Sequence, residues 1–269
     1  MMRGVQTFRV IVVTAILESG RLMAQDIPAD LLEDSHFREE FGVNEVTTPS
    51  IRKIFGQLAG WGKISWSRYG RAIPVDQPSE RPRLALSLGG LIAEGFFVTQ
   101  AEDVKRLEDL GNAIVRRASA LGTGAALVSH VNALMEYSQR GDWTGLREEL
   151  AKAQQRVQLE LVRLRDVEAV HLISLGGWLR AVEVVCAVAS DPYSPEKAQT
   201  LRRADVVTYY IEELETLRPE TQQLDYIIRL RRGLEKLRTL IGGDSPIPEE
   251  RLREIRGVVA EMAKCAFEG

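Results

Sequence analysis

The sequence predicts an all-α fold, a multi-helix bundle or short helical array of about nine or ten helices. Two short strings, LSLGGL at 86–91 and ISLGGW at 173–178, are nearly alike, and each lies within a long apolar stretch. After residue 82, apolar residues recur at three- and four-residue spacing over most of the chain, which is typical of amphipathic helices. No stretch sustains the period-two alternation of a half-buried strand, so we expect no significant sheet.

The two diglycine strings predict where the central helices pack. Two glycines destabilise a helix interior by roughly 2 kcal/mol relative to alanine. Close packing offsets this cost, because a helix without Cβ atoms can approach its neighbour more closely than the usual roughly 8–10 Å. We therefore expect Gly89, Gly90, Gly176 and Gly177 to lie where two buried helices cross. A ligand slot is the alternative, although neither string has the spacing of a nucleotide-binding loop.

The first 24 residues have the pattern of an export signal. A basic start precedes the apolar run 10–17, and cleavage after Ala24 would leave Gln25 first. We therefore expect a single helical domain over 25–269, located in the periplasm or secreted. No later segment is expected to be long and apolar enough to span a membrane. A retained N-terminal amphipathic helix would instead indicate a cytoplasmic adaptor.

Helix boundaries follow from capping residues, prolines and glycines. The sequence Thr-Pro-Ser at 48–50 opens the first helix, Gly60 ends it, and Pro82 lies in the first turn of the next. The expected N-caps of later helices are Asp142, Asp166, Ser194 and Asp205. The expected helices span about 51–59, 82–100, 102–121, 125–140, 143–164, 167–189, 195 onward, 205–217, 219–241 and 248–267.

The spacing of the diglycine strings allows two interpretations. The strings are 87 residues apart, and each is followed by an apolar stretch and then by a charged helical region. A degenerate two-fold duplication, with halves at about 49–140 and 141–269, is one explanation. Independent use of the same helix-packing chemistry is the other.

Residues 60–82 form a long irregular segment, because they contain three glycines and three prolines. Trp61, Trp66, Arg68 and Tyr69 lie in this aromatic loop. Aromatic rings beside an arginine can stack on a sugar or peptide or contact another protein. The aromatic loop is therefore the candidate binding surface, and a hydrophobic lid over the bundle end is the structural alternative.

Four ionisable residues interrupt the apolar helical stretches: Glu94, His171, Arg180 and Glu183. A carboxylate buried there needs an ionic or hydrogen-bonding partner. Parallel crossing of the diglycine helices would place Glu94 near Arg180, whereas antiparallel crossing would place it near His171. We interpret these residues either as a structural ion-pair network or as the polar pocket of an enzyme or small-ligand receptor.

Composition and motifs narrow the function class. A net charge of −3 does not indicate a nucleic-acid partner. The three histidines and two cysteines lack metal-ligand spacing. Cys186 and Cys265 are expected to be independent small apolar residues, and a disulfide between them is the alternative that export would allow. We predict no metal, no cofactor and no catalytic residue. The sequence favours a non-enzymatic protein that binds a protein or another envelope component, in an oligomeric state that these patterns do not specify.

Overall fold

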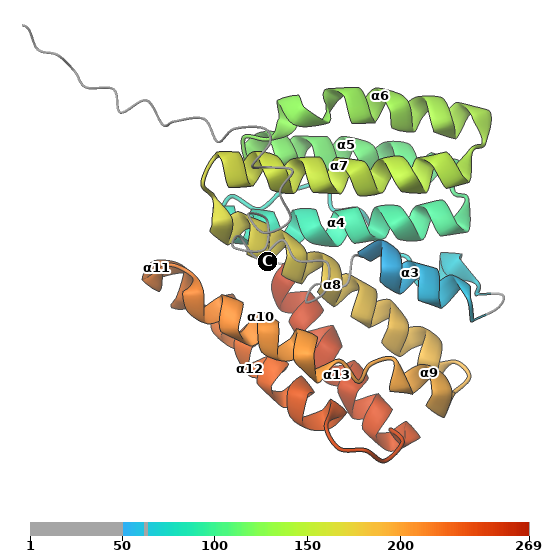
Figure 1. Cartoon of the computed structure of the whole chain (residues 1–269), viewed down its shortest axis with the longest axis vertical. Coiled ribbons are helices and arrows are strands. Elements are labelled where there is room, and N and C mark those ends of the chain that lie inside the picture. The colour runs from blue at the N-terminus through green and yellow to red at the C-terminus, as the bar shows by residue number, and fades with distance from the viewer. Residues whose placement is uncertain (1–50, 62–63, 269) are drawn as a thin grey trace, which may run out of the picture.

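The computed structural model describes residues 51–61 and 64–268, which form eleven α-helices, one 3-10 helix and no strand (Figure 1). The prediction of an all-α fold without a sheet is confirmed. The expected signal peptide 1–24 and the domain start at Gln25 lie outside the described residues. In chain order the elements are α3 (Ile51–Ala59), η1 (Trp66–Arg68), α4 (Arg81–Ala101), α5 (Val104–Ala120), α6 (Gly124–Arg140), α7 (Trp143–Arg163), α8 (Val167–Ser190), α9 (Pro195–Gln199), α10 (Ala204–Thr216), α11 (Pro219–Gln222), α12 (Asp225–Ile241) and α13 (Glu249–Phe267).

Three of the four predicted N-caps are confirmed. Asp142, Asp166 and Ser194 each accept a hydrogen bond from the backbone N–H three residues further on. The prediction for Asp205 is wrong, because α10 begins one residue earlier and has Arg203 at the capping position. The Asp205 carboxylate instead pairs with the Arg203 guanidinium at 2.8 Å, which lowers the pKa of that carboxyl.

The expected continuous helix over 219–241 is also wrong. The chain forms the short helix α11 and then the longer α12, with a break at Leu224, whose backbone is extended (φ −64°, ψ 131°). This break accounts for one helix beyond the expected number in the described part of the chain.

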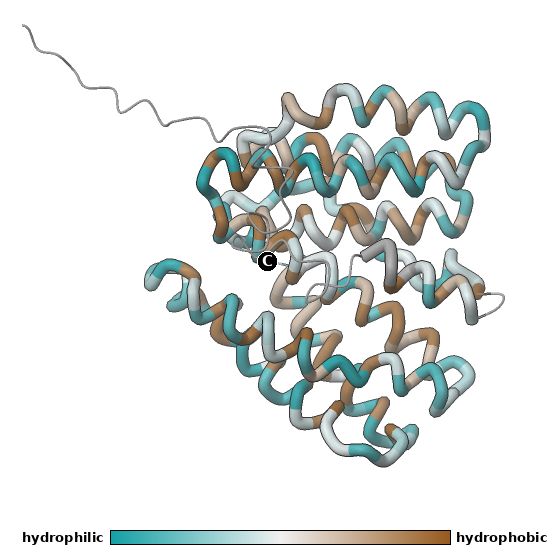
Figure 2. The backbone as a smooth tube through the Cα atoms, in the orientation of Figure 1, coloured by the Kyte–Doolittle hydropathy of each residue, from teal (hydrophilic) through white to brown (hydrophobic). Residues whose placement is uncertain are grey.

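The long helices form two groups, and α8 passes between them. Figure 1 shows α4 to α7 side by side in the upper group, with α10, α12 and α13 in the lower group. We call α4 and α8 the central pair, because α4 is the helix of the upper group that packs most extensively on α8. Helix α4 packs on α5, α7 and α8, and α8 packs in turn on α13. Apolar residues follow α8 along much of its length as it passes between the groups (Figure 2).

Helices α4 and α8 run parallel and touch backbone to backbone. A Cβ added to Gly89 would lie 2.0 Å from the carbonyl oxygen of Ile173, and one added to Gly176 would lie 2.1 Å from that of Leu86. The contact is reciprocal, because residues 86 and 89 correspond to 173 and 176 after a shift of 87 positions. A reciprocal contact of this kind is what a two-fold axis produces, but the duplication itself stays a prediction.

Helices α4 and α8 are long and apolar enough to cross a membrane by length and composition. The expectation that no later segment has these properties is therefore wrong on length and composition. Of the most apolar stretch of each helix, 89% is buried inside the fold, which is typical of the core helices of a globular domain. The apolarity arises because both helices are enclosed on nearly all sides.

The two cysteines are free thiols in different environments, and burial raises the pKa of Cys186 to about 12. We expect a thiol-alkylating reagent at pH 8 to modify Cys265 and to leave Cys186 unmodified. The thiolate is the reactive form, and such a pKa lowers its fraction by about a thousandfold relative to a free cysteine. Mass spectrometry of digested protein measures both sites, and both should react in urea. Equal modification of the two thiols in the folded protein would contradict this assignment.

Candidate functional site

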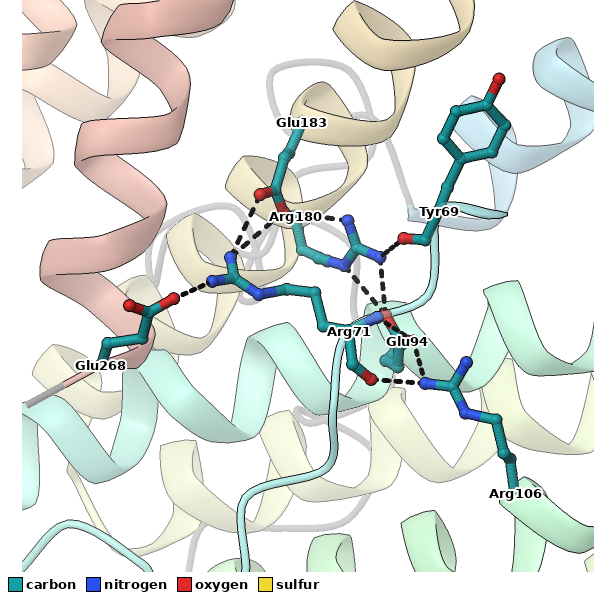
Figure 3. Close-up of polar contacts among 7 residues, drawn as sticks. All are labelled: Tyr69, Arg71, Glu94, Arg106, Arg180, Glu183 and Glu268. Carbon is teal, nitrogen blue, oxygen red and sulfur yellow. Dashed lines mark hydrogen bonds and ion pairs between the residues drawn. The ribbon is translucent and has the colours of Figure 1, made fainter. Parts of the chain in front are cut away.

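Six charged side chains meet beside the crossing of α4 and α8 (Figure 3). Carboxylates and guanidinium groups alternate along a chain of contacts, three of each, so their charges balance. In order of contact they are Glu268, Arg71, Glu183, Arg180, Glu94 and Arg106. We call this set the polar cluster.

The centre of the polar cluster is a buried ion pair between the two central helices. The side chains of Glu94 and Arg180 are each 3% exposed, and Nε and Nη2 of Arg180 lie 2.9 and 2.8 Å from Oε2 of Glu94. This is the arrangement expected for parallel crossing. Glu183, one turn further along α8, accepts from Nη1 of Arg180 at 2.9 Å. Both charges of the buried pair are therefore met by ionic partners, as burial requires.

The outer members of the polar cluster come from three other parts of the chain. Nη2 of Arg106, on α5, donates to Oε1 of Glu94 at 2.7 Å. Nη1 of Arg71 lies 3.2 Å from both carboxylate oxygens of Glu183, and its Nη2 contacts Glu268 after α13. Sequence reasoning missed Arg71, Arg106 and Glu268. No local pattern identifies them, since residues 71 and 268 are 197 positions apart.

His171 lies apart from the polar cluster. Its Nδ1 is 2.8 Å from a carboxylate oxygen of Glu213, on α10. Despite this distance, Nδ1 of His171 makes no hydrogen bond in the described part of the chain. The structure thus brings together three of the four predicted polar residues, Glu94, Arg180 and Glu183, and places the fourth beside another helix.

The polar cluster holds the backbone of the segment that follows η1. Arg180 donates to the carbonyl oxygen of Tyr69, and Arg106 donates to that of Arg71. The backbone N–H of Arg71 donates to Oε1 of Glu94 at 3.0 Å. Three charged side chains, one each on α4, α5 and α8, therefore bond to the backbone of Tyr69 and Arg71 in this irregular segment. Backbone bonds to charged groups are stronger than those between neutral groups.

Arg117 fixes the next part of the same segment from inside α5. Its side chain is fully buried, and it donates to the carbonyl oxygen of Asp76 at 2.8 Å and to the hydroxyl of Ser87 at 2.9 Å. All of its described partners are neutral oxygen atoms. Burial, and then the neighbouring charge of Arg116, lower the pKa of Arg117.

The aromatic loop lies against the helices with its rings half-buried. Trp66 packs edge-on against Phe97 at 5.7 Å between ring centroids, and the ammonium of Lys197 lies 5.7 Å from the Trp61 ring. Arg68, at the surface, pairs with Asp191 at 2.7 Å. The rings Trp61, Trp66 and Tyr69 pack against the main hydrophobic core. These contacts are those expected of a hydrophobic lid over the bundle.

A groove of about 550 Å³ lies beside the polar cluster. One wall is the segment 70–75, and the other is a face of α5. The α5 residues that line it are Arg106, Asp109, Asn112 and Arg116. Their spacing of three, three and four residues follows the helical repeat, so one polar helix face lines the groove. Sequence reasoning missed the groove, because its other wall is set by tertiary contacts.

Side chains arranged in this way can recognise a ligand by its charge and shape. The ionisable groups of the polar cluster are already bound to one another, and no group of three or more metal-binding side chains occurs in the described residues. No protein-family model matches the chain, and comparisons with curated proteins and with solved structures found no match. The function is therefore argued from the geometry of the groove and the polar cluster.

Proposed function

We propose that the protein is a non-enzymatic binding protein of the cell envelope whose binding site is the groove between the segment 70–75 and α5. The observation that carries this proposal is the fixation of one groove wall. Glu94, Arg106 and Arg180 bond to the backbone of Tyr69 and Arg71, and Arg117 bonds to that of Asp76. A wall held at both ends forms the groove before a partner arrives, which lowers the entropy cost of binding.

The ionic pairing inside the polar cluster supports a binding function over catalysis. A general acid or base needs an unblocked proton-transfer position at a substrate. Here the central carboxylate is bonded to two guanidinium groups and a backbone N–H. Its role in the proposal is to hold the groove wall in position.

A second candidate function is a small-ligand receptor or an enzyme. The convergence of Glu94, Arg180 and Glu183 favours it, because buried ionisable groups gather at functional sites. These three side chains do not line the groove, however, so a ligand bound there would contact the segment 70–75 and α5 instead. A further alternative, a cytoplasmic adaptor, would use the same groove without export.

A photocrosslinking amino acid placed in the groove tests the binding proposal. We expect covalent adducts with a protein of defined mass when it replaces Val75 or Asn112 in the cells that make this protein. Val75 is a large apolar residue that is 87% exposed at the groove. Met135 on α6, 56% exposed, is the matched control outside the groove. Equal adducts from Met135, or none from either groove position, would contradict the proposal.

Protein purified from the same cells tests the location in the cell envelope. Mass spectrometry of the native N-terminus should find Gln25 as the first residue. An intact Met1 would contradict export and would support the cytoplasmic adaptor.

A further inference from the structure

The residues that line the groove include more arginines than carboxylates, in a chain whose net charge is −3. Three arginines line the groove against a single carboxylate, Asp109. Arg71 and Arg106 are partly neutralised by the polar cluster. Arg116 has no ionic partner among the described residues, and Arg117 lies behind it with neutral partners. An anionic ligand would therefore meet unpaired positive charge at the Arg116 end.

The distance between the charges selects the kind of ligand. Arg106 and Arg116 are ten residues apart on α5, which corresponds to about 15 Å along the helix axis. One carboxylate or phosphate group cannot contact both. An extended peptide rises about 3.3 Å per residue and its side chains alternate in direction, so acidic side chains four residues apart lie on one face and would reach both arginines.

The opposite wall is suited to an extended chain. Residues 71–74 form no helix or strand, and the backbone N–H groups of Ala72, Ile73 and Val75 have no partner among the described residues. A peptide can add along an irregular or strand edge by bonding to such groups. Ile73 and the exposed Val75 add apolar surface between the charged ends.

We infer that the groove binds an extended acidic segment of a protein partner, with carboxylates four residues apart that reach Arg106 and Arg116. This inference rests on the proposed binding function and names the chemistry of the partner. Arg106 uses Nη2 for both Glu94 and Arg71, which leaves the N–H groups of Nε and Nη1, and its side chain is 27% exposed. Asn112, between the two arginines, can bond to the peptide backbone.

Fluorescence anisotropy with synthetic peptides tests the inference on the full chain. The probe is a peptide of ten residues that carries a neutral dye and has two glutamates four residues apart, with alanine, serine and threonine at the other positions. Two control peptides have the same length and dye. One has glutamine in place of both glutamates, and the other has the two glutamates next to each other. We expect the spaced acidic peptide to bind at least about fivefold more tightly than either, and more weakly as salt increases.

Arg116→Gln should weaken binding of the spaced peptide by about five- to tenfold, since it removes one charge-assisted contact outside the polar cluster. Arg238→Gln, an exposed arginine on α12, is the matched control and should leave binding unchanged. Equal binding of the glutamine peptide, or no effect of Arg116→Gln, would overturn the inference. The inference would also be overturned if inorganic phosphate or free glutamate displaced the labelled peptide at concentrations as low as those of the peptide itself. A single anion would then be enough to occupy the site.

If the acidic peptide does not bind, the photocrosslinking experiment still tests the proposed binding function on its own. Groove-specific adducts at Val75 and Asn112 together with no acidic-peptide binding would show that the partner has a different chemistry. Failure of both measurements would reject the groove as a binding site.

Discussion

Replacing Gly89 with alanine is expected to lower the free energy of unfolding by about 3 kcal/mol, the upper end of the range for overpacked cores. The added Cβ would lie 2.0 Å from the carbonyl oxygen of Ile173 and 2.8 Å from the amide nitrogen of Gly177. Both atoms belong to the α8 backbone, so no side-chain rotation relieves the overlap, and the two central helices must separate. Urea unfolding followed by circular dichroism measures the change.

Gly257→Ala is the matched control, because that glycine lies inside α13 with nothing within 4 Å of an added Cβ. This substitution should raise the free energy of unfolding by about 0.5–1 kcal/mol, since alanine is the better helix former. The double variant of Gly89→Ala and Gly176→Ala should cost less than the sum of the two single variants, because separation of the helices relieves both overlaps. Similar stability of Gly89→Ala and Gly257→Ala would show that the central helices do not pack backbone to backbone.

The all-α fold could be predicted because its determinants are local. Helical periodicity, caps and breakers are read within a few residues, and the paired glycines mark a close crossing since little else offsets their cost in a buried helix. The same local reasoning failed at Asp205. A carboxylate near a helix start resembles a cap, but the preceding Arg203 binds it instead.

Only the helical part of the polar cluster was predictable. Glu94 and Arg180 are conspicuous in apolar stretches, and parallel crossing of the diglycine helices brings them together. Arg71 and Glu268 lie in segments without periodicity, so their contacts depend on the path of the chain between helices. The antiparallel alternative with His171 could be discarded only from the structure, because the sequence does not specify the direction in which the two helices cross.

No sequence motif identifies the groove, because one of its walls is held in place by hydrogen bonds from the polar cluster. Gly70 lies against the guanidinium of Arg106, and an added Cβ there would be 2.0 Å from its Nη1. The segment thus passes close to α5 at Gly70, and residues 70–75 line the groove from there onward. Charged side chains supply hydrogen bonds to the backbone of Tyr69, Arg71 and Asp76, which helps to hold this irregular segment beside the helices.

Replacing Glu94 with glutamine is expected to lower the free energy of unfolding by about 3–5 kcal/mol, as for other buried ion pairs that lose one partner. The amide keeps the shape of the side chain but removes the negative charge between Arg106 and Arg180. Two guanidinium groups would then remain at the crossing, one of them almost fully buried, with no carboxylate between them. Urea unfolding measures the loss.

Glu249→Gln on α13 is the control for a charge change of the same type. Its partner Arg253 is one turn away, both side chains are more than half exposed, and we expect a change within about 0.5 kcal/mol. The loss at Glu94 should also reach the groove, because the Arg71 N–H bond to the carboxylate weakens and the wall at 70–75 loses one of its fixed points. Weaker peptide binding by Glu94→Gln under conditions where the variant is fully folded would link the buried ion pair to recognition. If Glu94→Gln were as stable as Glu249→Gln, this buried ion pair would not be needed to hold α4 and α8 together.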